Sequence, residues 1–404
     1  MNSRTTNYIL ISLLLLAVYG KGLFQDSIHV HDVDQARSSI IKVGNIFSLG
    51  CLLSIFLFAG KVSGITFKFN RENWVMNGFY AFMFLSAAIS LNPIISVSKF
   101  FQLLILIYAA RTVFNHAESA ENILIPYRNI VLIFSISCLL FPDSQVGSFI
   151  AQNRIAGNLL LYIPPNEMAE LVLFSLAVST FLFYKRKQTL VDAINIIVGI
   201  LVIFGTKSRF AYLIVALIVF LYLITNIKRF AILFFVGCIV ILYAVSQTDF
   251  IDVYILRDGD TSKLFELTGR VKYWLFALEN IDLKSLFIGH GFYYGSRFYL
   301  PGVDSHFAYK SNLDNTYLEI LFNSGIISLI LFILVLTKMF RISLKRGYDK
   351  MLFISFIMII SIKSLIGPSI VKETISLVFF FLTYHFCRPL GRHKTNSVAR
   401  YKQV

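Results

Sequence analysis

The sequence predicts an all-α integral membrane protein with about twelve transmembrane helices, and three observations support this. The 404 residues are 57% hydrophobic and 15% charged, whereas soluble domains are about 45–50% apolar and about 25% charged. The apolar residues stand in unbroken blocks close to the roughly 20 residues that cross a bilayer. The net charge of +15 is concentrated on alternate connections between these blocks, as expected for a chain that crosses a membrane repeatedly.

Twelve apolar blocks are candidates for the helices. Their continuity excludes a β-barrel, whose strands alternate apolar and polar residues in segments of about ten. The first block follows a short polar start without a small-residue cleavage site, so we interpret it as a retained helix. The blocks cover residues 7–24, 40–60, 74–92, 94–114, 127–142, 166–184, 190–206, 210–227, 229–246, 316–338, 351–367 and 371–387.

Basic residues set the predicted orientation. With the N-terminus inside, the inner connections hold more than half of the Lys and Arg residues and few acids. This distribution follows the positive-inside rule and predicts that both termini lie in the cytoplasm. It also accounts for the basic net charge without a nucleic-acid partner, and leaves membrane lipids as the surroundings of the chain.

Four regions follow from this topology. Residues 1–246 hold the first nine helices, 247–315 form one large loop on the outer face, 316–387 hold the last three helices, and 388–404 form a basic cytoplasmic tail. A loop of this length is usually functional. Its sequence GRVKYWLFALEN has apolar residues at helical spacing and predicts a short helix over 269–280.

The motifs for energy-coupling and metal sites are missing from the sequence. It contains no G-x-x-x-x-G-K-[ST], H-E-x-x-H or C-x-x-C. Its four cysteines are isolated in or beside apolar blocks. We therefore expect no metal and no cofactor, and any substrate of this protein must already be energised.

Several basic residues lie at the predicted outer boundary, where charge is costly. Lys207 and Arg209 occupy the short break GTKSRF between two blocks, Arg270 precedes the predicted loop helix, and Arg154 lies in the loop AQNRIAGN. The guanidinium fork suits phosphate. These residues fit an anion site, although anchors that extend to the membrane surface would have the same pattern.

Polar residues near the same boundary are further candidates. Asp314 and Asn315 precede the block 316–338, so they suit either a helix cap or a role in chemistry. His290 stands between glycines in FIGHGFYYG, where a turn would expose its ring, or where the ring would only pack. Asn166 follows two prolines and suits a helix start.

Five pieces of sequence occur in an order that resembles the O-antigen polymerase and ligase superfamily of bacterial envelopes. They are NRIAG with PPNEMA in 153–169, TKSR at 206–209, TGRVKYW at 268–274, FIGHG at 287–291 and DNTYLEILFNSG at 314–325. Each piece alone is weak. The ordered set, with a large loop before a late helix, is fairly specific.

The resemblance implies a metal-independent membrane glycosyltransferase of the bacterial inner membrane whose active site faces the periplasm. Its substrate would be an undecaprenyl-diphosphate-linked oligosaccharide, and a chain-length regulator would be its protein partner. It assigns diphosphate binding to Arg209 and Arg270, with Arg154 assisting, and Lys207 beside Arg209 is a further candidate. We expect Asp314 or His290 to position or deprotonate the acceptor hydroxyl and Arg270 to take part in catalysis. Asn315, Asn166 and Tyr317 are candidates for positioning the acceptor.

One departure from the family pattern concerns the reaction. Ligases, which move finished glycan to lipid A–core, typically carry a histidine where this chain has Asp314. The acid favours an O-antigen polymerase, with a ligase as the alternative. A flippase for lipid-linked sugars is a third reading, but such a transporter would hold ionisable residues deep in its bundle and lack a long outer loop.

Overall fold

The computed structural model describes residues 3–19, 33–58, 74–117, 119–140, 163–185, 189–225, 270–299, 313–345, 349–367 and 374–387. All elements assigned within these ranges are helices. They are α1 (Ser3–Tyr19), α2 (Val33–Phe58), α3 (Trp74–Ala88), α4 (Pro93–His116), α5 (Glu121–Leu140), α6 (Pro165–Tyr184), α7 (Thr189–Thr206), α8 (Arg209–Thr225), α12 (Arg270–Glu279), α13 (Leu283–Ile288), α14 (Tyr294–Tyr299), α15 (Thr316–Leu344), α16 (Lys350–Ile366) and α17 (Ile375–Cys387).

The all-α prediction is confirmed for the described residues. Every predicted block within them coincides with a helix, and the predicted loop helix 269–280 is α12. Block 229–246 and most of the large loop lie outside these residues. Four helices, α4, α5, α6 and α15, are long and apolar enough to cross a membrane by length and composition. The total of twelve spans and their orientation stay predictions.

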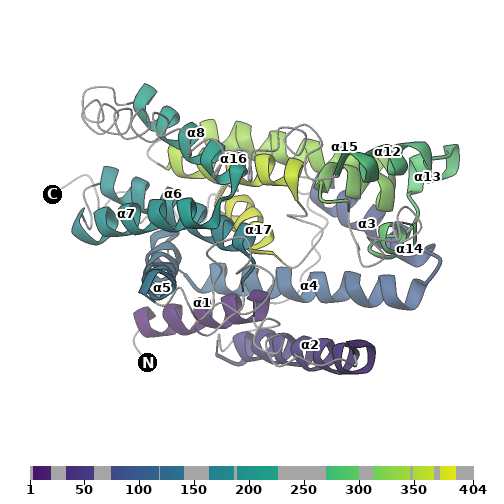
Figure 1. The fold of residues 1–404 in the computed structure, drawn as a ribbon, viewed down its shortest axis with the longest axis horizontal. Coiled ribbons are helices and arrows are strands. Elements are labelled where there is room, and N and C mark those ends of the chain that lie inside the picture. The colour runs from purple at the N-terminus through teal and green to yellow at the C-terminus, as the bar shows by residue number, and fades with distance from the viewer. Residues whose placement is uncertain are drawn as a thin grey trace.

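The long helices lie side by side, and the three short loop helices gather at one end of the molecule beside α15 and α3 (Figure 1). Helix α6 is central, since it contacts α5, α7, α8, α16 and α17, and most of its side chains are buried. A helix that is largely apolar on all sides suits such a position.

Polar contacts define two opposite ends of the bundle. At one end, Lys185 after α6 pairs with Asp349 before α16 (2.8 Å) and with Glu121 at the start of α5 (3.3 Å). At the other end, the start of α6 meets the α7–α8 turn, and the start of α15 meets the end of α16. These contacts show that successive helices run in opposite directions within α5–α8 and between α15 and α16.

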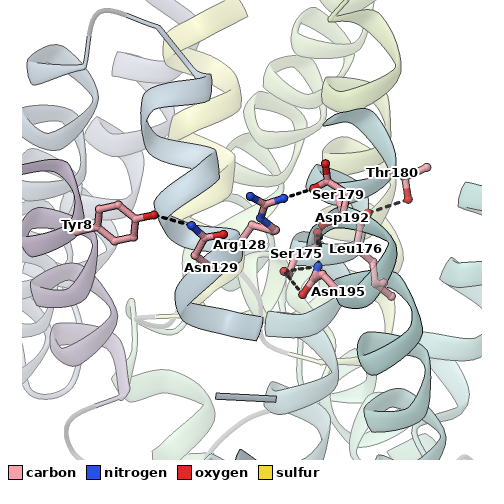
Figure 2. A network of polar contacts seen from close by, with 9 residues as sticks. All are labelled: Tyr8, Arg128, Asn129, Ser175, Leu176, Ser179, Thr180, Asp192 and Asn195. Carbon is pink, nitrogen blue, oxygen red and sulfur yellow. Dashed lines mark hydrogen bonds and ion pairs between the residues drawn. The ribbon is translucent and has the colours of Figure 1, made fainter. Parts of the chain in front are cut away.

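A buried polar network joins α5, α6 and α7 nearer the first of these ends (Figure 2). Arg128 of α5 forms an ion pair with Asp192 of α7, and both side chains are fully buried. One turn along α7, Asn195 donates to Ser179 of α6 (2.8 Å). Helix α5 begins six residues earlier than predicted, so Arg128 lies about two turns inside the helix instead of at its start, and Asp192 balances its charge.

Helix α15 is broken by a kink at Gly325, whose φ of 79° and ψ of 174° are not helical. A side chain at this position would overlap the carbonyl of Phe287, so only glycine fits. The break frees backbone carbonyls in the preceding turn. Those of Phe322 and Asn323 accept from the backbone N–H groups of His290 (2.8 Å) and Gly291 (3.0 Å), which docks the loop helices on α15.

Candidate functional site

The chain makes a tight turn just before α15, and three side chains hold it. Trp274 of α12 donates from Nε1 to the carbonyl oxygen of Leu313 (2.8 Å), and the N–H of Leu313 donates to Oε2 of Glu319 (2.8 Å). Asn315 caps α15, since its side-chain oxygen accepts from the backbone N–H of Leu318 (3.1 Å). The turn is therefore fixed on both sides of residue 314.

The side chain of Asp314 lies beside α12 instead of capping α15. Its φ of 51° is in the left-handed region, which aspartate tolerates better than most residues. Its Oδ2 lies 3.5 Å from Nε of Arg270, the first residue of α12. Each side chain keeps about a fifth of its surface exposed (22% for Asp314 and 19% for Arg270). The structure thus brings together two of the predicted catalytic residues.

Glu319, in the first turn of α15, ties the surrounding elements to this turn. Its Oε1 accepts from Oγ of Ser296 on α14 (2.7 Å) and from Nδ2 of Asn323 (2.9 Å). Its Oε2 accepts from Leu313, as described above. A carboxylate that accepts from three donors is well suited to a buried position, and Glu319 is 5% exposed.

His290 lies in the connection between α13 and α14. Its ring packs against Tyr299 (4.6 Å between ring centroids) and Phe322 (4.4 Å), and its Nε2 lies 3.0 Å from the carbonyl oxygen of Asn280. Burial lowers the pKa of His290, and the neutral ring can donate its Nε2 proton to that carbonyl. The described contacts of His290 thus join the loop helices to α15 and are not with the carboxylate–guanidinium pair.

A second group of predicted residues meets at the turn between α7 and α8. Lys207 adopts a left-handed conformation (φ 49°) and ends the helix that precedes it. Ser208 donates to Oδ1 of Asn166, the second residue of α6 (3.2 Å). Arg209 begins α8 at this point. The structure therefore gathers Lys207, Arg209 and Asn166 at one place, as an anion site would require.

The end of α16 connects the two groups. Thr316, the first residue of α15, donates to the carbonyl of Gly367 after α16 (2.9 Å). Lys363, one turn earlier on α16, places its ammonium 4.7 Å from the ring centroid of Phe210 on α8. Tyr317 faces α16, and its hydroxyl lies 3.4 Å from a carbonyl oxygen of that helix.

The predicted site residues leave out three charged residues near this site and include one that the structure does not describe. Two of them are the buried acids Glu170 and Glu319, and the third is the buried base Lys363. All three lie within apolar helices. An ionisable residue in such a helix is a signal in its own right, and it was available in the sequence. Arg154 lies outside the described residues, so its predicted part in diphosphate binding stays a prediction.

The arrangement combines guanidinium groups with a carboxylate at one end of a helical bundle. Arg209 and Arg270 offer planar donors suited to phosphate oxygens, and the Asp314 carboxylate can accept a proton from a hydroxyl. Among the described residues, no group of histidine, cysteine, aspartate and glutamate has the arrangement of a metal site.

A comparison with protein families gives one match. Residues 194–333 match the model of the O-antigen ligase family, over a range that includes Arg209, Arg270, His290 and Asp314. No curated protein matches the chain. Together with the apolar helices, the match supports a multi-pass membrane protein and, at the coarse level, an enzyme. Residues 194–333 thus confirm the resemblance of the chain to the O-antigen ligase and polymerase superfamily.

Proposed function

We propose that this protein is a polymerase of O-antigen or a related surface polysaccharide in the bacterial inner membrane. It transfers a growing glycan from undecaprenyl diphosphate onto the sugar end of an incoming lipid-linked repeat unit. The chain crosses the membrane twelve times with both termini in the cytoplasm, and the Arg270–Asp314 end faces the periplasm. A chain-length regulator protein acts with it.

The observation that carries this proposal is the placement of Asp314 beside Arg270. Because Asn315 supplies the helix cap, capping does not account for the Asp314 side chain, which pairs with Arg270. An acceptor hydroxyl attacks the anomeric carbon of the donor glycan while its proton passes to the Asp314 carboxylate. The bond between the anomeric carbon and the diphosphate oxygen breaks, and its electron pair leaves with the lipid diphosphate.

The arginines stabilise the charge that develops on the leaving group. Preorganised donors aimed at a developing anion act strongly in a site that excludes water. Arg209 at the start of α8 binds the lipid diphosphate, with Lys207 and Arg154 assisting. Asp314 is a better candidate for the base than His290, since the Nε2 of His290 already lies at the carbonyl of Asn280.

Acceptor choice separates a polymerase from a ligase. The family match fits both reactions equally well. The acid at position 314, where ligases typically carry a histidine, favours the polymerase.

A polysaccharide gel on cells that lack the gene tests whether the protein is a polymerase or a ligase. In the polymerase reading these cells keep a single repeat unit on their lipopolysaccharide core, because ligation survives. Wild type restores long chains, whereas Arg270→Ala and Asp314→Asn do not. Lys272→Ala, an exposed residue on the same helix, is the matched control and restores them. Bare core with accumulating lipid-linked chains would show a ligase instead.

A further inference from the structure

A buried ion pair joins α6 and α16 close to the α7–α8 turn. Nζ of Lys363 lies 3.3 Å from Oε2 of Glu170, and their side chains are only 8% and 1% exposed. A buried ion pair is weak evidence for stability, because well-packed apolar residues often serve as well. Within apolar helices, such residues usually have a function.

The surroundings of Lys363 place its ammonium between the two groups of the candidate site. On one side it lies over the ring of Phe210, which follows Arg209 in the chain. On the other side is the backbone of Gly367, where an added Cβ would lie 3.4 Å from Nζ. The carbonyl of Gly367 accepts from Thr316, just beyond the Asp314–Asn315 turn. Lys363 therefore contacts the first residues of α8 directly and is linked to the start of α15 through Gly367.

Glu170 does not depend on Lys363 for its hydrogen bonds. Its other oxygen, Oε1, accepts from the backbone N–H of Ser376 (3.0 Å) and from the hydroxyl of the same residue. An ammonium has three donor hydrogens, and the one oxygen of Glu170 that faces Lys363 cannot accept all three. The lysine can thus turn to another anion while the carboxylate keeps two donors.

We propose that Lys363 is a further cation of the diphosphate site and that Glu170 is its counterion while the site is empty. This inference rests on the proposed function and deepens it. Lys363 completes the Arg209 group, and the incoming lipid diphosphate competes with Glu170 for the ammonium. Loss of the Glu170 charge then strengthens diphosphate binding, which is the opposite of what a purely structural clamp would show.

The test measures the Kd of undecaprenyl diphosphate for the full-length protein in detergent. Glu170→Gln keeps an acceptor for Ser376 but removes the competing charge, and its Kd should fall several-fold. The double variant Glu170→Gln/Lys363→Met removes both charges and so leaves neither buried alone. Its Kd should exceed that of Glu170→Gln by about tenfold, the usual effect of one charge-assisted hydrogen bond.

Two controls and a parallel assay make the result specific. Lys99→Met removes another lysine near the same end of the bundle, hydrogen-bonded to Gln102, and should leave the Kd unchanged. With uncharged undecaprenol, all variants should bind alike. A Glu170→Gln protein that binds undecaprenyl diphosphate no better than wild type would overturn the inference. Equal Kd values for Glu170→Gln and the double variant would overturn it too.

Polymerisation by the same preparations separates this inference from the proposed function. If the wild type binds undecaprenyl diphosphate but makes no polymer, the proposed function fails, and the order of the Kd values still decides the role of Lys363. If polymer forms and the variants bind as the wild type does, only the role of Lys363 fails.

Discussion

At the scale of single residues, Glu319 matters because it holds the backbone next to Asp314. It accepts from the N–H of Leu313 and ties that turn to α14 through Ser296. It is a positioning residue, since it acts on the proposed reaction through Asp314. A positioning role can be told apart from substrate binding, because a displaced base lowers kcat while the diphosphate sites, and with them KM, stay intact.

We expect Glu319→Gln to lower kcat by about tenfold or more with little change in KM. The amide nitrogen of glutamine must face one of the three donors, and a buried donor without an acceptor costs about 1–3 kcal/mol. Kinetics of polymerisation with lipid-linked repeat units measure both constants. Glu279→Gln, exposed at the end of α12, is the control. A raised KM with unchanged kcat would contradict this role.

His290 should make the docking of the loop helices sensitive to pH. Burial lowers the pKa of its ring in the folded state, so the unfolded state, with a pKa near 6.5, binds a proton first as the pH falls. Stability is therefore present above about pH 6.5 and is lost as the pH falls below that value. Hydrogen exchange of residues 283–299, corrected for intrinsic rates, should increase between pH 7.5 and pH 5.5.

Glutamine at position 290 supplies the control for this pH effect. His290→Gln does not titrate in this range, so its exchange should show a flatter dependence on pH. An equal pH dependence in both proteins would show that another group is responsible.

At the scale of elements, the Arg128–Asp192 pair connects α5 to α7 inside the bundle. Removal of one partner leaves a buried charge alone, and this typically costs about 3–5 kcal/mol. We expect Asp192→Ala to lower the thermal unfolding temperature in detergent strongly. Arg128→Met/Asp192→Leu removes both charges and should recover most of the loss. A double variant as unstable as the single one would contradict the pairing argument.

The helices themselves were largely predictable, whereas their breaks and contacts were not. A run of apolar residues near the length of a bilayer is a local signal, so the bounds of α6, α7 and α8 and the start of α15 agree closely with the predicted blocks. The kink at Gly325 depends on the approach of Phe287 from a distant part of the chain. No local pattern in the sequence contains that contact. Helix α13 was missed although a local signal was present, because Asp282 and Ser285 form a capping box at its start.

In the candidate site, too, single residues were predictable from the sequence, whereas their contacts were not. Local motifs identified Arg209, Arg270 and Asp314 one at a time. The pairing of Arg270 with Asp314 is a tertiary contact between residues 44 positions apart in the chain. The choice between cap and chemistry at residue 314 also needed the structure, because Asp314 and Asn315 are both good caps, and only the fold shows which one caps α15.

At the scale of the whole molecule, the two ends of the bundle should lie on opposite sides of the membrane. Lys284 on α13 belongs to the Arg270–Asp314 end, and Lys345 follows α15 at the other end. In a protein whose native cysteines are replaced, Lys284→Cys should react with a membrane-impermeant maleimide in intact spheroplasts. Lys345→Cys should react only after the membrane is opened. The reverse pattern would invert the proposed topology.

The most direct test of the proposed function is polymerisation by the purified protein alone. The protein is reconstituted with lipid-linked repeat units, with a chelator and without nucleotide, and the products are separated by size. We expect a ladder of lipid-linked glycans spaced by one repeat unit, which Arg270→Ala and Asp314→Asn fail to make. No ladder, together with glycan transfer to added lipid A–core, would contradict the polymerase and identify a ligase.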